Sequence, residues 1–178
     1  PLLFGIAAWF SCFTAVEASV LVHIFGGAEF AAALVPVQIM ALYPAHQAYG
    51  QLASSVFHAT GKTKVLRNLA FIEHFGGFLL VWLLVAPQDM LGMGLGATGL
   101  ALKTVTTQFI MVNLLFWMAS RLIPLNFFRN LMLQGLILGS LLGIAWVCKQ
   151  ATGIYFADAA HQIIRFFLSG ILYSFMSL

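Results

Sequence analysis

The chain has 178 residues, of which 62% are hydrophobic and only 7% are charged. Soluble domains average about 45–50% apolar and about 25% charged residues. Eight basic and five acidic side chains cannot form the charged surface that a soluble fold of this size needs. The composition therefore predicts an integral membrane protein, and it excludes soluble enzymes, disordered chains and nucleic-acid-binding modules.

Six long apolar segments follow one another along the chain. A helix needs about 20 apolar residues to cross a bilayer core of about 30 Å. Turn-forming residues separate the segments, and none shows the alternation of a membrane strand. The sequence therefore predicts an all-α integral membrane protein with spans near 2–25, 30–60, 65–86, 95–120, 128–147 and 160–178.

Basic residues are concentrated in two of the predicted connectors. Residues 62–67 and 121–129 contain five lysines and arginines, whereas the connectors on the opposite side carry only Lys149. Cytoplasmic loops are enriched in lysine and arginine. Both basic connectors, and both ends of a six-span chain, are therefore predicted to face the cytoplasm.

Two carboxyl groups fall inside predicted spans. Glu17 lies deep in the first span and Glu73 lies near the middle of the third, beside His74. An ionisable group at this depth costs at least about 2.5 kcal/mol, so each is a functional candidate. Glu17 and Glu73 are candidates for binding a coupling ion, either a proton or sodium, or for pairing with a cation such as Lys103.

Polar side chains recur along the second predicted span at spacings of three and four, which place residues on one helical face. This stripe consists of Gln47, Gln51, Ser55 and His58, and an adjoining row of Tyr43, His46, Gly50 and Ser54. Proline at positions 36 and 44 is expected to bend the helix. Two interpretations remain open: the stripe lines a water-filled cavity, or it forms hydrogen bonds with a neighbouring helix.

The fourth predicted span repeats this pattern with a cation. Lys103, Thr106 and Asn113 fall near one face, together with Gly99. Lys103 either attracts an anionic group in a cavity or extends its ammonium to the membrane interface. Thr106 and Asn113 are candidates for contacts with a substrate.

Two glycine motifs have simpler structural explanations. Gly94, Gly96 and Gly99 match G-x-G-x-x-G, but the nucleotide-binding form needs a preceding strand and an acidic residue about 20 positions later, where this chain has Ala119. These glycines are instead expected to let the fourth span pack closely or unwind at its outer end. The G-x-x-x-G repeat at 135–143 predicts a packing face for another helix.

The remaining reactive residues predict neither a metal site nor an enzyme. Five histidines and two cysteines show no ligand spacing, so no metal and no cofactor are expected. No Ser–His–Asp order, paired carboxylates or P-loop is visible in the sequence. The chemistry predicted from these residues is translocation.

Three ordered motifs carry a resemblance to a known family. Ile24–Phe30 resembles the outer turn before a family helix, Ala59–Lys64 resembles the cytoplasmic turn after it, and Gly92–Ala101 resembles the opening of a later helix. In this order and spacing, the segment from Phe25 to about Asn113 is similar to the later half of the polysaccharide flippases. These belong to the multidrug/oligosaccharidyl-lipid/polysaccharide exporter superfamily.

The resemblance implies one lobe of a larger, MATE-like transporter. Family members have 12 or 14 helices in two related lobes, so residues 1–178 would form most of the second lobe, and the other lobe would belong to the same polypeptide. The implied function is to flip an undecaprenyl-diphosphate-linked oligosaccharide, an intermediate of surface polysaccharide or lipopolysaccharide synthesis, across the bacterial cytoplasmic membrane by alternating access.

Roles follow from the chemistry of such a substrate. Lys103, and also Arg67, are candidates for the diphosphate. The candidates for sugar contacts are Gln47, Gln51, Ser55 and His58. Two other functions stay open: a multidrug or cation antiporter of the same superfamily, which would favour acidic cavity residues, and a non-transporting membrane subunit or haem-binding anchor.

Overall fold

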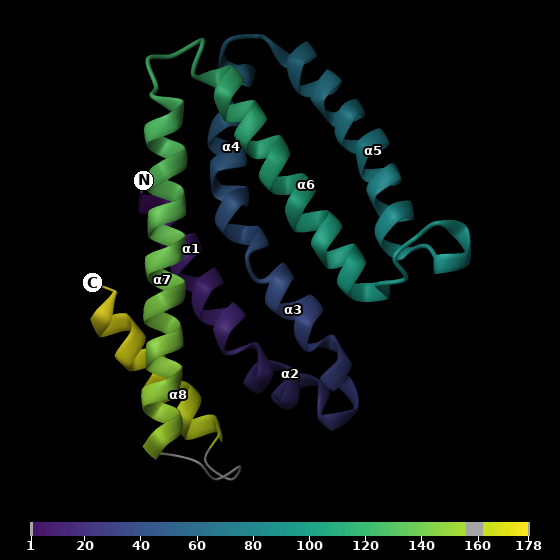
Figure 1. Cartoon of the computed structure of the whole chain (residues 1–178). Coiled ribbons are helices and arrows are strands. Elements are labelled where there is room, and N and C mark those ends of the chain that lie inside the picture. Colours follow the sequence, from purple (N-terminus) through teal and green to yellow (C-terminus); the bar gives the residue numbers. More distant parts are fainter. Residues whose placement is uncertain (1, 156–161, 178) are drawn as a thin grey trace.

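The computed structural model describes residues 2–155 and 162–177, which form helices and no strand (Figure 1). The all-helical prediction is thus confirmed over the described chain. The elements are α1 (Leu2–Val16), α2 (Ala18–Gly26), η1 (Ala28–Ala33), α3 (Leu34–Met40), α4 (Tyr43–Ala59), α5 (Thr63–Val85), η2 (Gln88–Met90), α6 (Gly96–Ala119), α7 (Phe127–Tyr155) and α8 (Gln162–Met176).

Four of these helical segments are long and apolar enough to cross a membrane: Ala28–Ala59, Thr63–Val85, Gly96–Ala119 and Phe127–Gly153. A fifth is added if the bent pair α1 and α2 is counted as one span. The described residues therefore support a multi-pass membrane protein with four or five spans, where the sequence predicted six.

The predicted first span is not one continuous helix. α1 and α2 meet at Glu17 with a bend of 71°. In an unbroken helix the Val20 amide would donate to the Val16 carbonyl, but here it donates to the Glu17 carbonyl at 3.0 Å. The Val16 carbonyl accepts a hydrogen bond from the Lys149 ammonium of α7 instead, at 2.6 Å.

The second predicted span also has a break, at a position that Pro44 explains, whereas Pro36 lies within the first turn of α3 without a break. η1, α3 and α4 together make a segment of 32 residues, interrupted by a turn at Ala41 and Leu42. Pro44 follows this turn in the first turn of α4. Proline cannot donate a backbone hydrogen bond and clashes with the carbonyl four residues earlier, here that of Met40, so α3 ends there.

The later spans correspond to the predicted ones with small shifts. α5 and α6 agree with 65–86 and 95–120 to within about two residues. α7 continues to Tyr155, beyond the predicted end at 147. α8 has only 15 residues, fewer than a helix perpendicular to the membrane needs to cross it, and residues 160–161 and 178 of the predicted sixth span lie outside the described chain.

The helices pack in a row that brings distant parts of the sequence together. α6 packs between α5 and the α3–α4 segment, α4 also contacts α1, α1 contacts α7, and α7 contacts α8 (Figure 1). One core cluster joins α1, α4, α7 and α8, and it is formed by Phe4, Ala8, Cys12, Ala45, Leu141, Ala145, Cys148 and Tyr173. A smaller cluster of Ala53, Phe57, Phe116 and Ala119 joins α4 and α6.

Tryptophans mark both ends of the α5–α6 pair. The α4–α5 and α6–α7 connections, with the two basic clusters in and beside them, lie at the same end of the bundle (Figure 1). Near that end the Arg121 guanidinium lies 4.0 Å from the ring centroid of Trp117. At the other end the Trp82 indole donates to the Met90 carbonyl at 3.1 Å. Tryptophan at both ends is typical of the two membrane interfaces.

Candidate functional site

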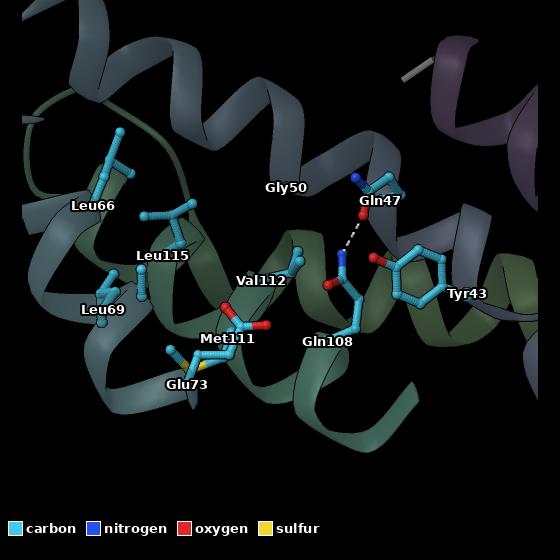
Figure 2. Close-up of a pocket in the computed structure, with 11 residues that line it drawn as sticks. Tyr43, Gln47, Gly50, Leu66, Leu69, Glu73, Gln108, Met111, Val112 and Leu115 are labelled. Carbon is cyan, nitrogen blue, oxygen red and sulfur yellow. Dashed lines mark hydrogen bonds between the residues drawn. The ribbon is translucent and has the colours of Figure 1, made fainter. Parts of the chain in front are cut away.

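A pocket of about 250 Å³ lies between α4, α5 and α6 (Figure 2). Its polar lining comes from one or two side chains on each of the three helices. The lining residues are Tyr43, Gln47, Gly50, Leu66, Leu69, Ala70, Glu73, Gln108, Met111, Val112 and Leu115. Glu73 and Gln108 lie near the midpoints of α5 and α6, so the pocket lies near the middle of these two apolar helices.

An amide pair joins two walls of this pocket. The Gln108 side-chain amide donates to the Gln47 carbonyl oxygen at 2.6 Å (Figure 2). Gly50 lies one turn along α4, where a Cβ atom would come within 3.0 Å of Val112, so glycine permits this close approach of α6. Each amide has further donor or acceptor capacity beyond this one bond. The pair can therefore bind a polar ligand.

Glu73 supplies the carboxylate of the pocket from α5. Its side chain is partly exposed and lies across the pocket from Gln47 (Figure 2). Gly77 follows one turn later on the same helix and is buried by Lys103 of α6. A Cβ atom at position 77 would lie 3.0 Å from Lys103 Cε and 3.1 Å from Nζ. The Lys103 ammonium therefore lies against α5 next to the pocket, although Lys103 is not among its lining residues.

The predicted stripe on α4 divides between two environments. Gln47 lines the pocket, whereas Gln51, Ser55 and His58 are exposed. The Ser55 hydroxyl donates to the Leu52 carbonyl of its own helix at 2.7 Å. A spacing of four rotates each successive residue by about 40° on a helix of 3.6 residues per turn, so the stripe winds away from α6.

The candidates on α6 are also spread around the helix. Thr106 is exposed, and the Asn113 side-chain amide donates to the Phe109 carbonyl of its own helix at 2.8 Å. Gln108, which the sequence analysis did not single out, faces the pocket instead. Gln108 lies three, four and seven residues before Met111, Val112 and Leu115, which also line the pocket, so the four residues share one face of α6.

Glu17 does not line this pocket and lies instead at the break between α1 and α2. Its carboxyl is fully buried, and Oε1 accepts a hydrogen bond from the Ser169 hydroxyl of α8 at 2.9 Å. Oε2 has no hydrogen-bond partner. Sequence reasoning selected Glu17 but had no signal for Ser169, since 152 positions separate the two residues.

No group of three or more His, Cys, Asp or Glu side chains able to hold a metal ion occurs among residues 2–155 and 162–177. Comparison of the chain with protein-family models, with curated proteins and with solved structures finds no match.

Proposed function

We propose that this chain is part of a transporter that flips an undecaprenyl-diphosphate-linked oligosaccharide across the bacterial cytoplasmic membrane by alternating access. The observation that carries this proposal is the pocket between α4, α5 and α6, with a Gln47–Gln108 amide pair and a carboxylate near the middle of α5 and α6. Polar groups in this position are costly in lipid and are typical of a substrate path.

The lining chemistry supports a sugar-bearing substrate. Sugar hydroxyls both donate and accept hydrogen bonds, and the amides of Gln47 and Gln108 and the phenol of Tyr43 can do both as well. Leu66 and Leu69 provide apolar surface on the α5 wall for the C–H faces of a sugar ring. The pocket therefore suits an uncharged polar group.

The flanks of the pocket support the other two parts of such a substrate. The Lys103 ammonium lies over Gly77, which is one turn after Glu73 on α5, and an ammonium is suited to a diphosphate. The outer face of α5 is apolar, with Phe75 and Phe78 each at least 70% exposed. A prenyl tail can remain in lipid along this face while the head group enters the pocket.

A second candidate function is a cation antiporter of the same kind of fold. Glu73 favours it, because this carboxylate lines the pocket and Lys103 does not. A cationic substrate would bind through Glu73, so Glu73→Gln would abolish its transport. A lipid-linked oligosaccharide that binds through amides would depend on Gln47 and Gln108.

Single alanine variants of the pocket amides test the proposal in proteoliposomes, with a fluorescent lipid-linked oligosaccharide whose sugar is quenched from outside. Gln47→Ala and Gln108→Ala are each expected to slow flipping about five- to tenfold, the value of one or two hydrogen bonds. Gln51→Ala is the matched control, since Gln51 lies one turn away on α4 but is exposed, and it should flip at the wild-type rate.

Wild-type flipping by both pocket variants would overturn the proposal. Loss of tetraphenylphosphonium transport in Glu73→Gln, with no oligosaccharide flipping by the wild type, would establish the antiporter instead.

A further inference from the structure

A second cavity, of about 500 Å³, lies beside the end of α1 and is separate from the proposed substrate pocket. It is bordered by the last turn of α1, by α3 and by the C-terminal part of α7. Its polar lining consists of Gln38 on α3 and of Lys149 and Gln150 on α7. Sites for small ligands have volumes of about 300–1,000 Å³, so this cavity is large enough to hold one.

Lys149 gives this cavity a positive charge. Its ammonium donates to the Val16 carbonyl at 2.6 Å and lies 3.4 Å from the Ser19 hydroxyl. An ammonium has three donors, so one remains for a ligand. The Val16 carbonyl lies at the negative end of the α1 dipole, which is equivalent to about half a charge and is outweighed by the full charge of Lys149. The cavity therefore favours an anion.

Two amides extend the set of donors beyond the ammonium. Gln38 is half-buried and Gln150 is exposed, and each side-chain amide supplies two N–H donors without adding charge. The donors come from two different helices that border one cavity. Hydrogen bonds from an ammonium to a phosphate are among the strong ones in proteins, and amides can bond to the remaining oxygens. The polar lining is therefore suited to a phosphate group.

The rest of the lining indicates an amphipathic ligand. Ile39, Leu42 and Leu142 provide apolar walls, and Trp146, which is 57% exposed, lies one turn before Gln150. Lys149 precedes the end of the apolar segment of α7 at Gly153 by four residues. A cation and a tryptophan near the end of a membrane helix are typical of the membrane interface, where lipid phosphates lie.

We propose that this cavity binds the phosphate group of an anionic phospholipid. Lys149, Gln38 and Gln150 donate to the phosphate oxygens, and an acyl chain lies along the apolar walls. Basic pockets between membrane helices recognise anionic lipid head groups in this way. The C-terminal end of α7 is opposite to the α4–α5 and α6–α7 connections, so the lipid belongs to the leaflet away from the two basic clusters (Figure 1).

Native mass spectrometry of the detergent-purified protein tests this site with phosphatidylglycerol and phosphatidylcholine of identical acyl chains. The wild type should bind the first phosphatidylglycerol molecule about fivefold more tightly, because only this lipid has a net negative charge to pair with Lys149. Gln38→Leu and Gln150→Leu should each weaken phosphatidylglycerol binding about fivefold through the loss of a hydrogen bond. Lys149→Met should abolish the preference for phosphatidylglycerol.

The controls separate the cavity from general lipid binding and from misfolding. Gln51→Leu makes the same change at an exposed position of α4, and Lys64→Met removes an exposed ammonium at the other end of the bundle. Both should bind phosphatidylglycerol as the wild type does. Lys149→Met also removes the contact with Val16, so the two glutamine variants, which keep that contact, provide the test if it does not fold.

Three outcomes would overturn the proposal. One is equal affinity of the wild type for the two lipids, or unchanged phosphatidylglycerol binding in both glutamine variants. Another is release of the bound lipid by millimolar inorganic phosphate, which would assign the cavity to a free anion. The third is tighter binding of undecaprenyl diphosphate that the same glutamine substitutions weaken, which would assign it to a transported substrate.

This lipid site does not rest on the proposed transport function. The binding measurement uses no oligosaccharide, and its variants lie on α3 and α7, whereas the flipping assay uses variants of α4 and α6. Failure of one measurement therefore leaves the other standing.

Discussion

Glu17 and Glu73 both lie within predicted membrane spans, and their surroundings are opposite. Glu17 has no exposed surface and bonds to Ser169 of α8, whereas Glu73 is partly exposed and lines a pocket with two amides. The difference in exposure comes from packing: α8 lies against Glu17, whereas Glu73 borders the pocket between α4, α5 and α6. Depth in the membrane alone therefore does not decide what a carboxyl group can do.

The two regions differ in how many neighbours each helix has. α1 packs against α7 and α4 and contributes three residues to the larger core cluster. α5 packs mainly on α6, and Gly77 is its buried residue. Glu17 is thus enclosed by the packing around the α1–α2 break, whereas Glu73 borders a pocket between α4, α5 and α6.

Cysteine labelling tests most directly whether the surroundings of Glu17 and Glu73 differ in accessibility to water. Glu73→Cys should react with a membrane-impermeant thiol reagent, because the pocket admits water, and Ser169→Cys should not react, because position 169 is fully buried. The native Cys12 and Cys148 are buried and give a low background. Mass spectrometry of the intact protein counts the labels, and equal labelling at the two positions would contradict the comparison.

Truncation of Tyr173 should give the largest loss of stability. This side chain is fully buried, stacks on Trp9 and Phe13, and donates to the Trp9 carbonyl at 3.2 Å. Tyr173→Ala should lower the free energy of unfolding by about 3–5 kcal/mol, the cost of truncating a buried aromatic residue. Denaturation of the purified protein in mixed micelles measures it.

Phe78→Ala is the control for that measurement, because Phe78 on α5 is 70% exposed. Its effect should be within about 0.5 kcal/mol, as for most substitutions at the surface. A similar loss in both variants would mean that α5 is packed as tightly as α8 under the conditions of the experiment.

Alanine substitutions in the two glycine motifs should change stability by smaller amounts and in opposite directions. A Cβ atom at Gly99 would lie 2.7 Å from the Leu84 carbonyl, whereas one at Gly139 would meet nothing within 4 Å. Gly99→Ala should therefore destabilise the protein by about 1–3 kcal/mol through overpacking. Gly139→Ala should stabilise it by about 0.5–1 kcal/mol, because alanine has the higher helix propensity. The same denaturation measurement would show whether the signs are opposite.

The sequence predicts the all-helical fold class and the bounds of α5 and α6, because the length of an apolar run largely determines a membrane helix. It also identifies Pro44 as the cause of a bend. The break at Glu17 could not be predicted, since the group that binds the freed Val16 carbonyl is the Lys149 ammonium, 133 positions after Val16. Only the packing of α7 on α1 brings these groups together.

For the candidate site, the sequence identifies the three helices that form the pocket and the residues Gln47 and Glu73. The sequence does not show that Gln47 and Gln108 line the pocket while Gln51 and Thr106 are exposed outside it. Polar residues on a membrane helix occur both on water-facing and on lipid-facing sides. Hydroxyls add to this ambiguity. Ser55 and Thr104, for example, donate to carbonyls of their own helices and need no neighbour.

The tryptophans at the ends of α5 and α6 have a consequence for how the protein responds to its lipids. These helices, of 23 and 24 residues, are about 35 Å long, which exceeds a typical hydrocarbon thickness of about 30 Å. Trp82 and Trp117 lie near opposite ends of the pair, and with both rings at the membrane interfaces a tilt would fit the pair to the bilayer. Longer or shorter acyl chains would change that tilt, and with it the width of the space in which Glu73 and Gln108 face each other.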